Sequence, residues 1–163
     1  MMMGGLSLAG MGPPPFVFAP EGGRVEGPAF SRVFQTLTTL VVGGCFSWVV
    51  RLWLRDAITI GPGMMWVAAG LVLMSWTWWS VLRSRTTITN QVIEQRWIWN
   101  KRLPLADLAY VKLIRLPGLD WLVAPRLYAR TLSGKFLVFY GATPQLVAEF
   151  SRMSRELAEF RRM

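Results

Sequence analysis

Two long apolar segments lie close together in the N-terminal half of the chain, and they constrain the fold more than any other feature. They are Phe34–Leu54 and Met64–Leu82, and a short insert over residues 55–63 separates them. At about 1.5 Å per residue in an α-helix, each segment is long enough to cross a hydrocarbon core roughly 30 Å thick. The sequence therefore predicts an antiparallel transmembrane helical hairpin over residues 30–82.

Tryptophan residues cluster at the two ends of this predicted hairpin. Those beside the insert are Trp48, Trp53 and Trp66, and those at the end of the second segment are Trp76, Trp78 and Trp79. Tryptophan favours the membrane–water interface, so the distribution predicts an aromatic belt at each end. For some of these rings the alternative is packing against protein or against a flat cofactor, such as a pigment held by a neighbouring subunit.

Small residues occupy the middle of both segments: Gly44 and Ser47 in the first, Ala69 and Gly70 in the second. Lipid provides little hydrophobic drive between helices, so close backbone approach at small residues has to supply the contact. We expect Gly44 and Ser47 to face Ala69 and Gly70 within the hairpin. The alternative is that the same residues face the helix of a partner.

Basic residues near the segment ends indicate the orientation. Seven flank the outer ends and two lie near the connecting turn: Arg24, Arg32, Arg83, Arg85, Arg96, Lys101 and Arg102, against Arg51 and Arg55. Because cytoplasmic flanks carry the excess of basic residues, this distribution predicts both termini in the cytoplasm and the turn outside.

The chain lacks the side chains that most often carry chemistry. It has no histidine, and its one cysteine, Cys45, lies within the first apolar segment. The commonest general base, metal ligand and haem ligand are therefore missing, and the carboxylates form no pair suited to acid–base catalysis. We expect no catalytic residue, no metal site and no cofactor ligated by this chain. Contact with lipids, or with pigments held by neighbouring subunits, stays open.

Most of the positive charge follows the hairpin. The formal net charge is +9, and residues 83–163 carry 14 basic and six acidic residues. A basic domain tethered at a membrane faces anionic phospholipid headgroups or the acidic surface of a partner, and the tether argues against nucleic acid. The candidate contact residues are Arg83, Arg85, Lys101, Arg102, Arg126, Tyr128 and Arg130. A solvated positive-inside surface is the alternative.

Residues 1–29 have the composition of an extended tail rich in proline and glycine. The Pro13-Pro14-Pro15 run favours polyproline II, and the segment is expected to be disordered in isolation. We expect this tail to lie along a neighbouring subunit.

Residues 83–163 change to a β-strand pattern. Strand candidates lie at residues 86–89, 91–99 and 109–116, with a turn at residues 100–102 and a break at Pro117-Gly118. The runs 126–132 and 135–140 flank Ser133-Gly134, which predicts a β-hairpin with a two-residue turn. A small antiparallel sheet should result.

The chain ends in a predicted amphipathic helix over residues 143–162. Thr143 suits the N-cap and Pro144 the first helical position. Apolar residues recur at spacings of three and four along one stripe: Leu146, Phe150, Met153, Leu157 and Phe160. The stripe is expected to close the open side of the sheet, with a coiled-coil partner as the alternative.

Two stretches of this domain resemble a known family. Residues 86–94, Thr-Thr-Ile-Thr-Asn-Gln-Val-Ile-Glu, and residues 103–111, Leu-Pro-Leu-Ala-Asp-Leu-Ala-Tyr-Val, are similar to motifs of bacterial pleckstrin-homology-like domains that follow a pair of membrane helices. The similarity covers roughly residues 64–140. Gln91 replaces the family's usual arginine, and residues 83–163 offer fewer strand candidates than the family's seven strands. The resemblance implies a curved antiparallel sheet with a C-terminal helix, a non-catalytic role and a bacterial inner-membrane location.

These features lead to two hypotheses about function. The first is a non-catalytic accessory or scaffold subunit of a larger inner-membrane complex, which it stabilises or helps to assemble; family relatives suggest an energy-converting complex, photosynthetic or respiratory. The second is a freestanding membrane-anchored module that binds anionic lipid headgroups. A transient assembly chaperone differs from the first hypothesis only in whether it co-purifies with the mature complex.

Overall fold

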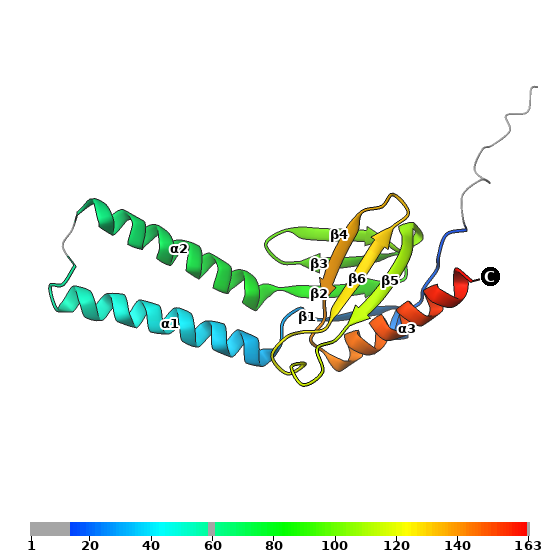
Figure 1. Ribbon diagram of the computed structural model, residues 1–163, viewed down its shortest axis with the longest axis horizontal. Coiled ribbons are helices and arrows are strands. Elements are labelled where there is room, and N and C mark those ends of the chain that lie inside the picture. The colour runs from blue at the N-terminus through cyan, green and yellow to red at the C-terminus, as the bar shows by residue number, and fades with distance from the viewer. Residues whose placement is uncertain (1–13, 59–60, 163) are drawn as a thin grey trace, which may run out of the picture.

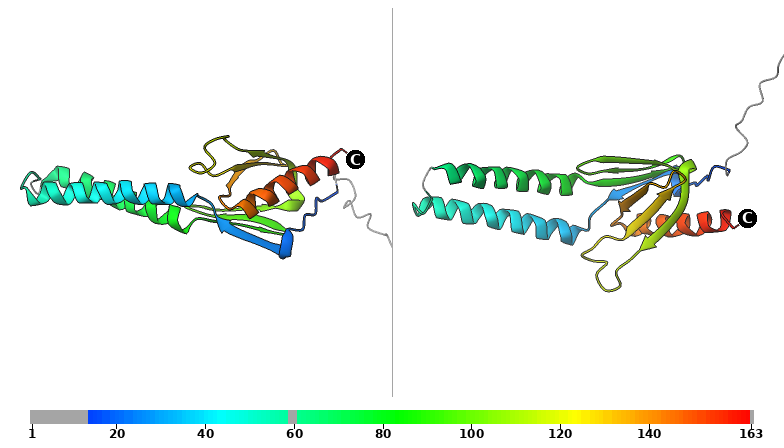
Figure 2. Two further views of the ribbon diagram at one scale, coloured as in Figure 1. Left: turned by 90° about the horizontal axis from the view of Figure 1, so that it is seen from below. Right: turned by 45° about the horizontal axis from the view of Figure 1, so that its top comes forward.

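The computed structural model describes residues 14–58 and 61–162 and has two parts, a long helical hairpin and a β domain (Figure 1). The hairpin consists of α1 (Arg32–Leu54) and α2 (Pro62–Arg83), which lie side by side in both Figures 1 and 2. Both are long and apolar enough to cross a membrane. The helix bounds expected from the sequence, 34–54 and 64–82, are confirmed to within two residues.

Local chemistry explains where these helices begin. The Ser31 hydroxyl accepts a hydrogen bond from the Phe34 backbone N–H at 3.1 Å, as an N-cap residue should. Pro62 opens α2, where its missing N–H costs nothing. Helix α1 begins at Arg32 and α2 ends at Arg83, so both residues lie at the end of the hairpin that adjoins the β domain.

The two helices meet along a seam of residues spaced three and four apart. The shielded positions of the seam are Gln35, Thr38, Val42, Cys45, Val49 and Leu52 in α1, and Met64, Leu71, Met74, Trp78 and Val81 in α2. This spacing is typical of left-handed helix pairs. The Trp78 indole N–H also donates a hydrogen bond to the Thr39 hydroxyl at 2.9 Å.

The small residues do not lie in this seam. Gly44, Ser47, Ala69 and Gly70 are all exposed. A Cβ added to Gly44 or to Gly70 would meet no atom within 4 Å. The prediction that the two pairs face each other is wrong, because bulky seam residues such as Met74 and Trp78 set the helix separation. The alternative, contact with a partner helix, stays a prediction.

The β domain contains two antiparallel sheets. The first has the order β1 (Arg24–Pro28), β2 (Arg85–Thr89), β3 (Val92–Arg96), β4 (Asn100–Pro104), and the second has β5 (Leu108–Ile114), β6 (Arg126–Thr131), β7 (Phe136–Tyr140). Short 3-10 turns lie at Glu21–Gly23 and Leu105–Asp107. Side chains of both sheets share one core, including Ile88 and Leu103 from the first sheet and Leu127 and Phe139 from the second.

Strand β1 precedes the hairpin in the sequence, so the hairpin is inserted between two neighbouring strands. Its residues pair with β2 from Arg24↔Thr89 to Pro28↔Arg85. Phe16 and Phe18 lie in the domain core. The prediction of a separate tail is therefore wrong for residues 16–29, whereas the part over residues 1–13 lies outside the described residues. A strand reading Arg-Val-Glu-Gly-Pro has little intrinsic strand preference, and its partner lies beyond the hairpin, so local patterns miss it.

The strand count follows from this insertion. Residues 83–163 supply the six strands β2–β7, and the seventh strand, β1, comes from before the hairpin. The predicted break at Pro117-Gly118 is confirmed, since β5 ends at Ile114 and residues 115–125 form a loop.

Two local predictions in this domain are wrong. Residues 100–102 belong to β4, and the turn lies at residues 97–99 instead. The three polar residues 100–102 suggested a turn, but polar residues are also expected in a strand whose outer face is exposed to solvent. Residues 132–135 connect β6 to β7, and a hydrogen bond between Thr131 and Lys135 closes a loop over the three residues 132–134, with Gly134 at φ 82°. A three-residue loop that ends in the left-handed region is the next commonest hairpin solution.

The C-terminal helix α3 (Pro144–Phe160) forms with bounds close to the prediction of 143–162. Leu146, Phe150, Met153 and Leu157 are buried. The helix packs against β5 and β1, which lie in different sheets, and so closes the open side of the β domain (Figure 2). Thr143 precedes the helix, but its side chain makes no capping hydrogen bond.

Candidate functional site

The seven candidate contact residues do not form one site. The structure places five of them on two separate surfaces, which we call the junction groove and the sheet face. Arg83 and Arg85 belong to the junction groove, and Arg126, Tyr128 and Arg130 belong to the sheet face. Lys101 and Arg102 are engaged elsewhere on β4. The Lys101 ammonium donates to the Val138 carbonyl at 3.4 Å, and the Arg102 guanidinium lies 2.6 Å from the Glu94 carboxylate.

The junction groove lies where α2 runs into the outer face of the first sheet. Only Ser84 separates α2 from β2, so Arg83 and Arg85 flank the point where helix becomes strand. The groove encloses about 580 Å³. Its main lining residues are Arg83, Arg85, Arg96 and Asn100 on one side and Trp76, Trp79 and Leu82 on the other.

The strand register concentrates positive charge in this groove. Arg85 and Arg96 are direct cross-strand neighbours on β2 and β3. Like charges directly opposite each other destabilise a sheet. Arg85 is partly compensated by the Glu26 carboxylate at 3.1 Å, whereas no ion pair forms at Arg96 within the described residues. Arg83 lies over the Trp79 ring, 4.4 Å from its centroid.

Glu26 is shared between two arginines. Its carboxylate lies 2.7 Å from Arg24 and 3.1 Å from Arg85. Hydrogen bonds from Arg24 and then from Arg85, together with their charges, hold the pKa of this carboxyl below its usual range. Glu26 therefore stays ionised at neutral pH but can offset only part of the charge of two cations.

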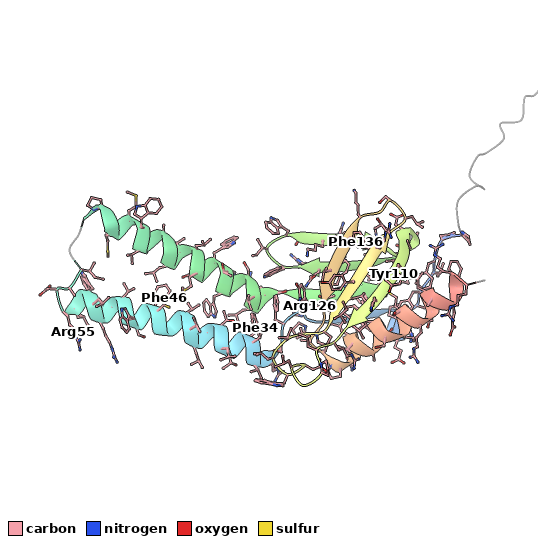
Figure 3. All side chains as sticks on the ribbon, in the orientation of Figure 1. Phe34, Phe46, Arg55, Tyr110, Arg126 and Phe136 are labelled. Atoms are coloured by element: carbon pink, nitrogen blue, oxygen red, sulfur yellow. The ribbon has the colours of Figure 1, made fainter. Side chains whose placement is uncertain are left out.

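The sheet face is the outer surface of the second sheet, where three rows of three side chains point outward. From the end nearest the hairpin, the rows are Ile114, Arg126, Tyr140; Lys112, Tyr128, Val138; and Tyr110, Arg130, Phe136. Figure 3 labels Arg126, Tyr110 and Phe136 on this sheet. These nine positions include three cations and four aromatic rings and contain no carboxylate.

In two rows of the sheet face, an arginine side chain lies beside an aromatic ring of the same row. Arg126 lies 5.6 Å from the Tyr140 ring centroid, and Arg130 lies 5.3 Å from that of Phe136. Such stacking holds the guanidinium groups in place on the sheet face. Tyr110 is 54% exposed and Phe136 is 68% exposed, so the face presents large rings to its surroundings.

An aromatic cluster joins the β domain to the start of α1. The Phe30 ring lies 5.3 Å from Phe34, 5.4 Å from Trp97 and 5.6 Å from Tyr140, centroid to centroid. The Ser31 hydroxyl donates to the Leu122 carbonyl at 3.0 Å, which ties the 115–125 loop to the same point. These contacts fix the domain relative to the hairpin.

Two apolar tips flank the hairpin at this junction. The β3–β4 turn exposes Trp99 by 71%, and the 115–125 loop exposes Trp121 by 58%. The β3–β4 turn lies at the hairpin end of the domain, because Arg96 and Asn100, on either side of it, lie in the same row as Arg85. The 115–125 loop lies at the same end, because the Leu122 carbonyl accepts a hydrogen bond from Ser31.

The six hairpin tryptophans divide between two environments. Trp48, Trp53 and Trp66 are exposed towards the connecting turn, and Trp76 and Trp79 are exposed near the β domain. Trp78 instead faces α1 in the seam. The aromatic belt stays a prediction, because it depends on a membrane at both levels.

Sequence reasoning missed Arg96 and Trp97 as members of the site. Each lies more than ten residues along the chain from Arg83, and only the β2–β3 register brings Arg96 beside Arg85. The signal that could have found Arg96 is its place at the end of a strand antiparallel to one beginning with Arg85.

Within the described residues, no group of three or more cysteine and acidic side chains is placed to hold a metal ion. Comparisons with protein-family models, with curated proteins and with solved structures find no match for this chain. The fold defines the class of molecule: a β domain with a long apolar helical hairpin inserted between its first two strands.

Proposed function

We propose that the hairpin spans a bacterial inner membrane, with both termini and the β domain in the cytoplasm. Only 6% of the apolar window of each helix is buried, whereas a core helix of a soluble protein would be mostly covered. Helix α1 is also preceded by β1, which pairs with β2, so it is not a leader that cleavage could remove. The excess of basic residues on the domain side supports the orientation.

We further propose that the chain is a non-catalytic accessory or scaffold subunit of a larger inner-membrane complex. The observation that carries this proposal is the sheet face, with three cations, four aromatic rings and no carboxylate. Large exposed rings beside arginine are typical of interface centres. The partner that fits by charge is an acidic segment of a neighbouring subunit on the cytoplasmic side.

The outer surface of the hairpin supports the same proposal. Gly44, Ser47, Ala69 and Gly70 are exposed, so a helix of another subunit can approach the backbone there. The pleckstrin-homology-like resemblance is compatible with a four-stranded and a three-stranded sheet closed by a C-terminal helix. That resemblance is the reason for favouring an energy-converting complex.

A charge-reversal experiment tests the accessory-subunit proposal. Arg126→Glu with Arg130→Glu should abolish co-purification of the neighbouring subunits, because both changes oppose an acidic partner. The matched control is Arg155→Glu with Arg162→Glu, which makes the same change of charge at two exposed residues, one on α3 and one just after its end. The measurement is native mass of the intact protein, extracted from its own membranes in mild detergent.

Three outcomes would decide the matter. Loss of the complex with the sheet-face variant alone supports the proposal. A free monomer for the unaltered chain contradicts it. Loss of selective binding to anionic vesicles with an intact complex would instead favour the freestanding lipid-binding module, reading headgroups through Arg126 and Arg130.

A further inference from the structure

We propose that the junction groove binds a phosphate group, and that the source of this phosphate is an anionic phospholipid in the leaflet next to the β domain. The inference rests on the proposed membrane location of the hairpin and is independent of membership in a complex. It goes beyond the accessory role, because the groove shares no residue with the sheet face.

The arginines that line the junction groove favour binding of an anion. Arg85 and Arg96 stand opposite each other in the β2–β3 register, and Arg83 adds a third guanidinium at the end of α2. The two carboxylates that line the groove are both engaged: Glu26 with Arg24 and Arg85, and Glu94 with Arg102. An anion between Arg85 and Arg96 would turn an unfavourable cross-strand pair into a shared site.

The geometry of arginine selects phosphate among anions. A guanidinium offers paired N–H donors in a planar fork, which matches the oxygens of a phosphate group. Asn100 follows Arg96 in the same row and adds an amide donor at the rim of the groove. The groove, of about 580 Å³, is lined by these three arginines and by Arg24, and it has room for a phosphate together with its attached glycerol.

One side of the groove is apolar, and this apolar wall favours a lipid over free phosphate. Trp76, Trp79 and Leu82 line the side of the groove formed by α2, and all three are exposed. A phospholipid held by its phosphate at Arg96 would lay its glycerol and upper acyl chains against this wall. Inorganic phosphate would leave those rings uncovered, so the wall adds affinity only for a lipid.

The end of α2 lies at the depth where such a headgroup would sit. Arg83 ends the apolar helix and Arg85 follows after Ser84, and the Arg83 guanidinium is held over the Trp79 ring at 4.4 Å. Basic residues just outside a membrane helix attract anionic lipids by about 1 kcal/mol each. The groove adds to this general attraction a fixed arrangement of donors.

The test is a lipid titration of the full, delipidated chain in detergent, followed by native mass spectrometry. The probes are phosphatidylglycerol, phosphatidylcholine, glycerophosphoglycerol and inorganic phosphate. We expect phosphatidylglycerol to bind more tightly than phosphatidylcholine, and the two soluble probes to bind far more weakly. Arg96→Gln should weaken phosphatidylglycerol binding roughly fivefold. The control Arg162→Gln, with the same charge change outside the groove, should leave binding unchanged.

A second variant separates the contribution of the apolar wall to lipid binding from that of the arginines. Trp79→Ala should weaken lipid binding without changing the weak binding of inorganic phosphate. Equal binding of the two lipids, or an unaltered affinity in Arg96→Gln, would overturn the proposal. Inorganic phosphate that binds as tightly as phosphatidylglycerol would overturn the lipid as its source. Co-purification of partner subunits is measured separately and is decided by the sheet-face variant, so the two proposals can fail independently.

Discussion

At the scale of single residues, Glu26 links the N-terminal strand to the groove. Its folded pKa lies below the usual value of 4.5, chiefly because of the hydrogen bond from Arg24 and then that from Arg85. A carboxyl with a lowered folded pKa stabilises the fold above its unfolded pKa, and this stabilisation is lost as the pH falls through the folded value. Glu26 is partly exposed, so solvent screens the effect.

The corresponding prediction concerns Glu26→Gln. This variant should be less stable than the unaltered chain at neutral pH, and the difference should shrink as the pH falls below about 4.5. Chemical unfolding in detergent at a series of pH values measures it. Glu159→Gln, on the wet side of α3, is the control, for which we expect no such trend. A difference that persists unchanged into acid would show that Glu26 acts through packing and not through its charge.

At the scale of elements, residues 14–23 act as a strap across the end of the β domain. Phe18 is 1% exposed, and the Arg152 guanidinium from α3 lies 4.7 Å from the centroid of its ring. Arg152 also donates to the Ala19 carbonyl. The Phe16 ring packs against the Phe160 ring in a tilted arrangement, with 5.7 Å between ring centroids. The strap therefore holds α3 and β1 together before the chain enters the hairpin.

Removing the strap's main anchor should be costly. Phe18→Ala leaves a cavity in a shared core, and we expect a loss of about 3–5 kcal/mol in the free energy of unfolding. Val17 is the adjacent but exposed residue, and Val17→Ala should change stability by no more than about 0.5 kcal/mol. Hydrogen exchange of β1 and β2 in the full chain would report the same difference. Similar exchange in both variants would mean that the strap contributes nothing to the sheet.

The elements also differ in how far the sequence alone could predict them. The two hairpin helices and α3 follow from continuous apolar runs and from a stripe with a 3.6-residue period, which are local signals. Strand β1 pairs with a strand on the far side of the hairpin insertion, so no local pattern encodes it. The Arg85–Arg96 pairing depends on the exact register across the β2–β3 turn, which the strand candidates at residues 86–89 and 91–99 did not fix. The small-residue prediction failed because several residues competed for the seam, and packing between bulky side chains decided which face was used.

At the scale of the whole molecule, the hairpin is an insertion into a β domain that is complete without it. The Ala29 N–H donates to the Ser84 carbonyl at 3.2 Å, and Pro28 pairs with Arg85, so the two ends of the insertion lie side by side. The core of the β domain comes from residues outside the hairpin, from Phe16 to Leu157. We therefore expect the β domain to fold without the hairpin.

This architecture predicts that the domain folds without its hairpin. Replacing residues 31–83 with a short glycine-rich turn should give a water-soluble protein, since β1 and β2 already meet at that point. Circular dichroism and amide exchange should report a protected sheet that includes β1. Removing residues 14–23 as well should destabilise it, because Phe16 and Phe18 then leave the core. An aggregated or unprotected product from the first deletion would mean that the hairpin, through Phe34 packed on Phe30, is part of the fold of the domain.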